Sequence, residues 1–149
     1  MYPGSTWFSY TPSGSLTPGT NYVVTISTRL RSLDGDTLKT PYTFSFTTAP
    51  FMVTGTSPGN GDVSVSRSQS IALYFSDYID TAAARSSFSI SPAVDGTLTL
   101  YTNSNYFYFY PSTGFAANTE YTVTISDQMR SSGGYRLQAP YVLKFTTGY

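Results

Sequence analysis

The sequence predicts an all-β protein that folds as a β-sandwich, and three observations point to this fold class. Ser and Thr make up 45 of the 149 residues, and aromatic residues make up 17%; Thr and the aromatic residues suit strands because their side chains pack well on a pleated surface. Several segments alternate between apolar and polar residues, as half-buried strands do. Turn-forming runs, such as Pro58-Gly-Asn-Gly61 and Pro111-Ser-Thr-Gly114, separate these segments.

The last two thirds of the chain contain enough short alternating segments for a complete sandwich. About seven or eight strands are predicted there, near residues 51–57, 70–76, 87–91, 95–101, 105–111, 120–126 and 141–147. Short strands at this spacing over about 100 residues are typical of a Greek-key sandwich. Asp80 precedes three alanines, and its carboxylate can accept hydrogen bonds from the first N–H groups of a helix. We therefore expect one helical turn over residues 80–85.

An internal repeat organises the chain. Asn21-Tyr-Val-Val-Thr-Ile-Ser27 recurs as Glu120-Tyr-Thr-Val-Thr-Ile-Ser126, so each residue of the first copy corresponds to the residue 99 positions later. With this offset, 18 of the 42 positions from Phe8 to Ala49 are identical. Repeats of this kind indicate tandem structural units. We predict that residues 1–49 are the C-terminal half of a repeat and that residues 50–149 are a complete repeat.

The two copies also show which faces should be buried. Tyr22, Val24 and Ile26 match Tyr121, Val123 and Ile125, and the positions between them are more polar. A position that stays apolar at a period of two indicates the core face of a strand. A half sandwich would leave this face bare, with an unpaired strand edge beside it. We expect adjacent repeats or self-association to complete the half domain by strand pairing, either within a longer array or through strand donation between chains.

The segments in this order resemble the bacterial Ig-like domain of S-layer proteins and other large surface proteins. The resemblance lies in Thr56-Ser-Pro-Gly-Asn-Gly61, Ile71-Ala-Leu-Tyr-Phe-Ser76 with Asp77 and Asp80, Glu120-Tyr-Thr-Val-Thr-Ile125, Gly134 with Leu137, and Phe145-Thr-Thr147. It implies immunoglobulin-like Greek-key β-sandwich repeats in tandem arrays that act as spacers, lattice modules or adhesive stalks. Together with the low content of charged residues, 11%, the resemblance implies an extracellular or cell-surface location.

The composition argues against several kinds of chemistry. The chain has no His and no Cys, so the usual general bases and strong nucleophiles are absent. We expect no enzymatic activity, no catalytic residues and no organic cofactor. The formal net charge is zero, and a nucleic acid partner is not expected because no basic field would attract its phosphates. No apolar run is long enough to span a membrane.

The aromatic run from Tyr106 to Pro111 is the strongest candidate for an interaction surface. Phe107 and Phe109 correspond to aromatic residues of the first copy and should face the core, so their neighbours should point outward. The candidate interaction residues are Tyr106, Tyr108, Tyr110 and Trp7, the last of which matches Tyr106. Three readings stay open at this point: exposed tyrosines without a partner, a contact between subunits, and a platform on which sugars stack.

Asp34 and Asp36 form the one candidate metal site. Two carboxylates in one turn could contribute to a calcium site, but calcium takes six to eight oxygen ligands, and the matching residues of the second copy are Gly133 and Tyr135. A solvated turn is the favoured reading. The sequence thus predicts a non-catalytic structural module of an extracellular filament, S-layer or stalk. The alternative is a carbohydrate- or surface-binding or spacer module of a larger secreted adhesin or enzyme.

Overall fold

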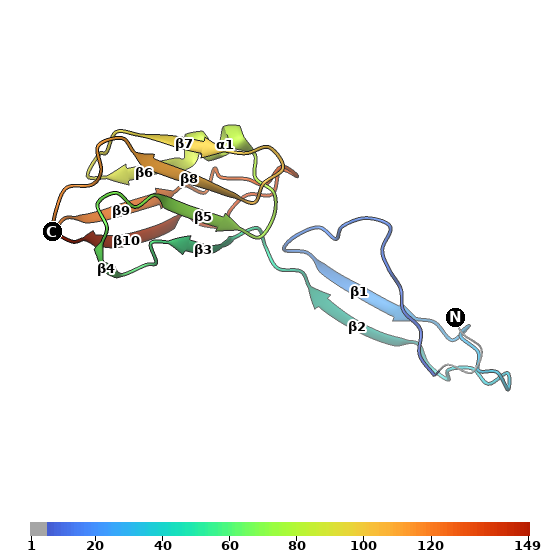
Figure 1. The fold of residues 1–149 in the computed structure, drawn as a ribbon. Coiled ribbons are helices and arrows are strands. Elements are labelled where there is room, and N and C mark those ends of the chain that lie inside the picture. Colours follow the sequence, from blue (N-terminus) through green and yellow to red (C-terminus); the bar gives the residue numbers. More distant parts are fainter. Residues whose placement is uncertain (1–5) are drawn as a thin grey trace. The chain divides into compact units, whose positions relative to one another are not determined.

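The computed structural model describes residues 6–149, and the chain divides into two compact units, residues 1–50 and 51–149 (Figure 1). Residues 1–5, which the repeat pairs with residues 100–104, lie outside the described residues. We call the two parts the N-terminal unit and the C-terminal unit and describe each by itself.

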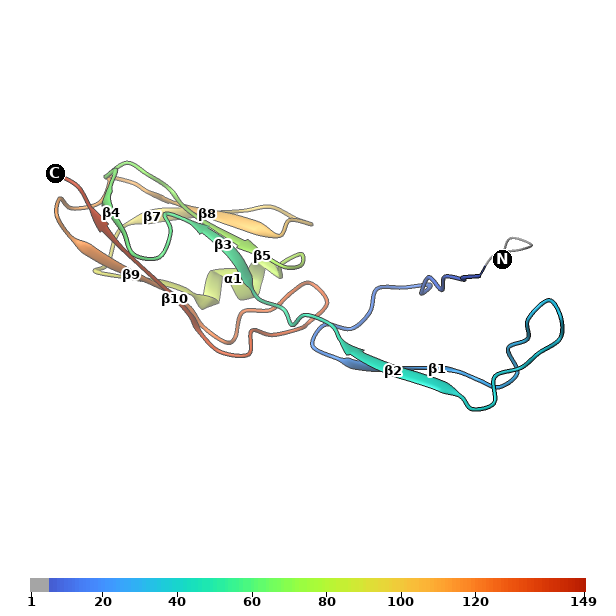
Figure 2. The same ribbon diagram turned by 90° about the horizontal axis from the view of Figure 1, so that it is seen from below.

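The C-terminal unit is a sandwich of two four-stranded sheets, seen as two layers in Figure 2. The first sheet has the order β4-β10-β9-β6 and the second the order β3-β5-β8-β7. In chain order the elements are β3 (Val53–Ser57), β4 (Asp62–Val65), β5 (Ile71–Phe75), α1 (Thr81–Ser87), β6 (Phe88–Ser91), β7 (Gly96–Leu100), β8 (Tyr106–Pro111), β9 (Glu120–Ile125) and β10 (Tyr141–Thr147). The all-β class and the sandwich predicted from the sequence are confirmed.

Alternation along the strands builds the core between the two sheets. Phe107 and Phe109 of β8 and Val123 of β9 are at most 5% exposed, as their spacing at every second position predicts. Phe88 of β6 joins the layers, since its ring stacks on Phe109 with a centroid distance of 5.1 Å. Close-packed aromatic pairs of this kind stabilise a core beyond the area that they bury.

Two features differ in detail from the sequence prediction. The helix α1 runs to Ser87 rather than to Arg85, although Asp80 caps it as expected: its Oδ1 accepts hydrogen bonds from the N–H groups of Ala82 and Ala83 at 2.9 and 3.1 Å. The strand β4 was not predicted. It is only four residues long and pairs in parallel with β10, a long-range contact that a local pattern does not reveal.

The N-terminal unit contains one antiparallel hairpin, formed by β1 (Asn21–Ile26) and β2 (Tyr42–Thr47). Among the described residues, neither strand pairs with a third strand. The apolar face of the hairpin is therefore open: Phe44 and Phe46 are 44% and 41% exposed. Residues 7–12, which match β8 of the other unit, form no strand.

The hairpin nevertheless closes with the same contacts as its counterpart. Gly35 and Gly134 sit at matching turn positions with φ of 90° and 87°, a conformation that glycine adopts without steric cost. In both copies the residue two positions after this glycine forms an isolated β-bridge across the turn. Thr37 pairs with Arg31, and Arg136 pairs with Arg130. The turn geometry is thus fixed locally, whether or not a second sheet covers the hairpin.

Candidate functional site

The outer surface of the second sheet of the C-terminal unit carries a row of tyrosines. Because Phe107 and Phe109 point into the core, Tyr106, Tyr108 and Tyr110 alternate with them and point outward from β8. Tyr74 of β5 lies directly opposite Tyr106 in the sheet, and opposite residues share a face. With Tyr101, these five residues form what we call the tyrosine face.

The five rings of the tyrosine face touch one another in a continuous row. The ring centroid of Tyr106 lies 6.0 Å from that of Tyr74, 5.9 Å from that of Tyr101 and 5.6 Å from that of Tyr108. Tyr108 and Tyr110 are 5.8 Å apart. The rings are partly exposed, with 37% for Tyr74, 47% for Tyr101 and 46% for Tyr110. The sheet therefore holds a broad aromatic surface in contact with solvent.

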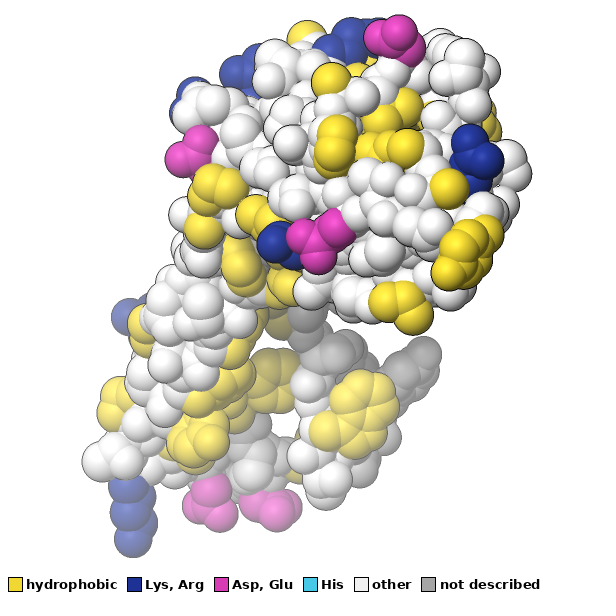
Figure 3. All heavy atoms as spheres, turned by 90° about the vertical axis from the view of Figure 1, so that its left-hand side faces the viewer, with side chains coloured by type: hydrophobic (Ala, Val, Ile, Leu, Met, Phe, Trp, Pro, Cys, Tyr) yellow, Lys and Arg dark blue, Asp and Glu magenta, His cyan; other side chains and the backbone are white. Residues whose placement is uncertain are grey.

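The surroundings of the tyrosine face are polar but uncharged. Thr97 and Thr99 of β7 lie opposite Tyr110 and Tyr108, and Ser57 of β3 lies opposite Ala72 of β5. A hydrogen bond with Tyr74, followed by the charge interactions of neighbouring tyrosines, raises the pKa of Tyr108 above its ordinary value, so its hydroxyl stays neutral at physiological pH. Figure 3 draws one side of the chain, where charged side chains of both signs are interspersed among apolar side chains and other atoms.

The open hairpin face of the N-terminal unit is the second candidate surface. A hollow with a volume of about 940 Å³ lies between this face and residues of the preceding segment. Tyr22, Val24 and Phe46 line it from the strands, and Trp7 and Leu16 line it from the segment. Its lining is mainly apolar, and a solvent-exposed apolar sheet face of this kind is a candidate interaction surface.

The sequence pattern of one known family matches nearly the whole chain. The family is described as "Bacterial Ig-like domain", and its pattern matches twice, over residues 3–48 and 48–147. The chain belongs to this family. The two matches meet near the boundary between the two units, and the Ig-like sandwich of the C-terminal unit is the fold that the family name describes.

No curated protein has a sequence that matches this Ig-like chain. Solved structures that are similar to it include LD transpeptidase LdtMt1 in complex with imipenem (23% identity, TM-score 0.48), an L,D-transpeptidase from Mycobacterium smegmatis (18%, 0.48) and surface layer protein SbsC, domains 1–6 (16%, 0.48). The matches cover 64%, 67% and 66% of this chain. They span only 39%, 41% and 14% of the three structures, and the likeness concerns the fold alone.

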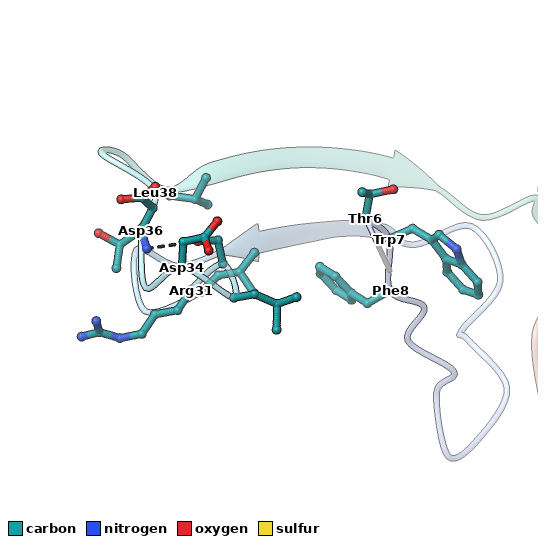
Figure 4. A pocket seen from close by; sticks show the side chains of 11 residues that line it. Thr6, Trp7, Phe8, Arg31, Asp34, Asp36 and Leu38 are labelled. Atoms are coloured by element: carbon teal, nitrogen blue, oxygen red, sulfur yellow. Dashed lines mark hydrogen bonds between the residues drawn. The ribbon is translucent and has the colours of Figure 1, made fainter. Parts of the chain in front are cut away.

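The predicted interaction residues belong to two different units. Tyr106, Tyr108 and Tyr110 lie side by side, whereas Trp7 belongs to the other unit of the Ig-like chain and is 65% exposed. Trp7 lines the hollow over the hairpin and a smaller pocket next to the turn around Asp34 (Figure 4). Its match to Tyr106 in the repeat therefore does not place it on an equivalent surface.

Asp34 and Asp36 lie at the turn end of the pocket in Figure 4, and both are exposed. The turn is held by its backbone: Gly35 N–H donates to the Ser32 carbonyl at 3.1 Å, and Gly134 N–H donates to the Ser131 carbonyl at 2.9 Å in the second repeat. This turn geometry exists in both copies and does not depend on the two aspartates. No group of three or more metal-ligating side chains occurs within residues 6–149, and calcium binding stays a prediction.

Sequence reasoning missed two members of the tyrosine face, Tyr74 and Tyr101. Tyr74 was identifiable in part, because Ile71, Leu73 and Phe75 mark the inward positions of its strand and leave Tyr74 on the outer face. The sequence did not show that β5 is the neighbour of β8, which is the fact that brings Tyr74 to Tyr106.

In the described part of the chain, no helix is long and apolar enough to cross a membrane.

Proposed function

We propose that the chain is a non-catalytic structural module of an extracellular surface assembly, a filament, S-layer or stalk, in which Ig-like half repeats complete one another. One observation carries this proposal. The hairpin of the N-terminal unit has the register and turn contacts of β9–β10, but its apolar face is bare. We infer that residues 1–49 are the C-terminal half of a repeat. We also infer that their hairpin pairs with the N-terminal half of a repeat, which covers its apolar face.

The complete repeat supplies the template for that completion. In the C-terminal unit β4 pairs with the outer edge of β10, and β6 pairs with the outer edge of β9. The other sheet covers the apolar face, so that Leu143 and Phe145 are at most 1% exposed. A half repeat equivalent to residues 50–99 would therefore bring two edge strands and part of a covering sheet to β1–β2, from the same polypeptide or from another copy.

The size of the open face supports a structural partner. Burying one large apolar side chain contributes about 1.5–3 kcal/mol, and Tyr42, Phe44 and Phe46 are each more than 40% exposed. The free strand edges add unpaired N–H and C=O groups that favour strand addition. Completion of the half repeat satisfies both features at once.

A non-catalytic role is supported by the side chains available. The sequence has no His and no Cys. Among the described carboxylates, Asp80 is engaged in capping α1 and in an ion pair with Arg130, whose Nε lies 2.8 Å from Asp80 Oδ2. Asp62 is likewise used locally, accepting a hydrogen bond from Gly59 N–H at 2.7 Å. These groups hold the fold of the repeat together.

The decisive experiment adds the partner that the repeat defines. A second copy of residues 50–99 is placed ahead of Met1, and hydrogen exchange of the β1 and β2 amides is compared with that of the original chain. We expect the amides at the strand edges to become protected, and we expect self-association, measured by light scattering, to be lower than in the original chain. Unchanged exchange in both strands would contradict the proposal.

A matched pair of variants distinguishes association through the hairpin face from nonspecific hydrophobic association. Phe44→Ser removes an apolar group from the open hairpin face, whereas Val63→Ser removes one from β4, where the side chain is 73% exposed. We expect Phe44→Ser to reduce self-association of the original chain and Val63→Ser to leave it unchanged. Electron microscopy of the same samples shows whether the associated material forms filaments or sheets.

The alternative function, a carbohydrate- or surface-binding module, is favoured by a separate observation. The tyrosine face lies on the complete repeat and takes no part in closing the half repeat. A ligand bound there would be compatible with either a structural or a spacer role for the rest of the chain.

A further inference from the structure

We propose that the tyrosine face of the C-terminal unit binds an uncharged polysaccharide strand. This role goes beyond the structural function proposed above and concerns a different surface. It rests on the shape of the aromatic row, on the hydroxyl groups beside it, on the absence of charge along its strands, and on a difference between the two repeats.

The shape of the tyrosine face fits an extended ligand. Three successive outward positions of β8 are tyrosines whose ring centroids lie 5.6 and 5.8 Å apart, and Tyr74 and Tyr101 widen the row beside Tyr106. The rings already pack against one another, so little side-chain freedom remains to be lost on binding. On the neighbouring strand β5 the residue opposite Tyr108 is the small Ala72, which is 4% exposed.

The chemistry of the face fits a sugar. A tyrosine presents a flat apolar ring with a hydroxyl at its tip, and a pyranose ring presents flat C–H faces with hydroxyls at its rim. The hydroxyls of Thr97, Thr99 and Ser57 stand at outward positions of the flanking strands and can exchange hydrogen bonds with those of a sugar. Stacking and hydroxyl contacts would thus come from the same surface.

The charge of the face selects among ligands. On β5, β7 and β8 no outward position carries an acidic or basic residue. A charged ligand would lose hydration on this surface without meeting an opposite charge, which is unfavourable. A neutral polysaccharide avoids this cost, whereas an acidic one does not.

The two repeats differ at this surface, which argues against a contact between repeats. The residues that match Tyr108 and Tyr110 are Ser9 and Thr11, although the strand-pairing residues of β9 and β10 are largely retained in β1 and β2. A contact that joins successive repeats would be needed in each copy. The first copy keeps an aromatic residue, Trp7, at the position of Tyr106, but Tyr108 and Tyr110 belong to the second copy alone, as expected for a ligand site extended on a shared scaffold.

The test uses the whole chain and a panel of neutral polysaccharides. Affinity electrophoresis in gels containing soluble β-glucan, xylan, mannan or α-glucan, and pull-down with insoluble cellulose and chitin, measure binding; polygalacturonate serves as the charged comparison. We expect retention by at least one neutral polymer and none by polygalacturonate.

Two variants replace a tyrosine of the second repeat by the residue at the matching position of the first repeat. Tyr108→Ser and Tyr110→Thr should each weaken binding roughly fivefold, in line with the loss of one aromatic contact. Tyr135→Ser is the control, because Tyr135 is also partly exposed, at 36%, but lies on the turn near Gly134. Thermal unfolding of all three variants checks that the sandwich is intact, and Tyr74→Thr provides a second probe if either β8 variant unfolds.

Three outcomes would overturn the proposal. They are no retention on any neutral polymer, equal retention of the tyrosine-face variants and the Tyr135→Ser control, and a loss of self-association, seen by sedimentation, in the tyrosine-face variants without any change in retention. The last outcome would identify a subunit contact. None of these substitutions alters the hairpin face, and retention on a polysaccharide does not measure its completion, so the structural proposal and this one succeed or fail separately.

Discussion

The hairpins β1–β2 and β9–β10 have nearly the same internal structure but opposite surroundings. Tyr22 stacks on Phe46 with a centroid distance of 5.7 Å, and Tyr121 stacks on Phe145 at 5.6 Å. Tyr121 and Phe145 are 3% and 1% exposed, whereas Phe46 is 41% exposed. The comparison teaches that the local sequence is sufficient to specify the hairpin and its register, while burial of its apolar face depends on the other half of the repeat.

The hydrogen bonds at the open end of each hairpin, where the chain enters the first strand, are also conserved between the two copies. The N–H of Thr17 donates to the Tyr22 hydroxyl at 2.8 Å, and the N–H of Ala116 donates to the Tyr121 hydroxyl at 2.9 Å. This tyrosine anchors the chain that enters the first strand of the pair. It works in both environments because donor and acceptor are only five residues apart.

The largest expected difference between the hairpins concerns Phe145 and Phe46. Phe145→Ala should cost about 3–5 kcal/mol in the C-terminal unit, because it leaves a cavity beside Phe115 and Tyr121. Phe46→Ala should cost less than about 1 kcal/mol, because much of its ring is already in water. Native-state hydrogen exchange gives the opening free energy of each hairpin separately.

The same pair can sharpen the comparison further. When residues 50–99 precede Met1, the cost of Phe46→Ala should rise toward that of Phe145→Ala. Equal and small costs for both substitutions in the original chain would show that the C-terminal core is not packed as described.

A smaller difference is expected at Thr147 and Thr48. The Thr147 hydroxyl donates to the Ala116 carbonyl at 2.6 Å and accepts from Thr119 N–H at 3.0 Å, and the residue is 2% exposed. Thr147→Val leaves these backbone groups without a partner and should cost about 1–3 kcal/mol. Thr48 makes the matching bonds at 2.6 and 2.9 Å in a more exposed place, where water can replace its hydroxyl.

Urea unfolding, followed by hydrogen exchange in each unit, measures both threonine substitutions. Thr48→Val should change the stability of the N-terminal unit by less than half as much as Thr147→Val changes that of the C-terminal unit. A larger effect at Thr48 would mean that the open hairpin depends on this contact more than the covered one does.

The smallest expected effect concerns Asp80, which has no counterpart in the N-terminal unit. Asp80→Ala removes the cap of α1 and should cost about 1 kcal/mol. Hydrogen bonds from Ala83 N–H and from Arg130 lower the pKa of Asp80, so its stabilisation is present above the ordinary aspartate pKa and is lost as pH falls below about 4. Urea midpoints of the wild type and Asp80→Ala at pH 7 and pH 3 measure this convergence.

Asp95→Ala is the control for Asp80, because Asp95 is exposed and its carboxylate makes none of the hydrogen bonds or ion pairs recorded within residues 6–149. It should leave the urea midpoint unchanged at both pH values. A difference between wild type and Asp80→Ala that stays constant down to pH 3 would contradict the capping role of the ionised carboxylate.

Most strands of the C-terminal unit were predictable from alternation and turn residues, and the second copy added which faces are buried, whereas the strand β4 was not predictable. The positions of β9 and β10 and their buried faces followed from the two copies, since Val123 and Leu143 keep apolar partners in the first copy. The strand β4 was missed because it is only four residues long, has a single buried residue and pairs only with β10.

The same reasoning explains the segment around Phe8. Its match to Phe107 predicts a strand, yet residues 7–12 form none. In the C-terminal unit β8 lies between β5 and β7 and is hydrogen-bonded to both. Without such neighbours, a strand sequence has no ladder to join. For the tyrosine face, the outward positions of β8 were predictable by alternation, but the contribution of β5 required the order of the strands.

The parallel pairing of β4 and β10 determines how the C-terminal unit would carry tension. Gly61 N–H donates to the Lys144 carbonyl at 2.7 Å, and Gly148 N–H donates to the Val65 carbonyl at 2.9 Å. Because the two strands run in the same direction, opposite pulls on the start and the end of the unit slide β4 along β10 and load these bonds together. A hairpin pulled at its open end instead loses its bonds one after another. The second and the last strand of the unit, β4 and β10, would therefore resist tension through hydrogen bonds that are loaded in shear.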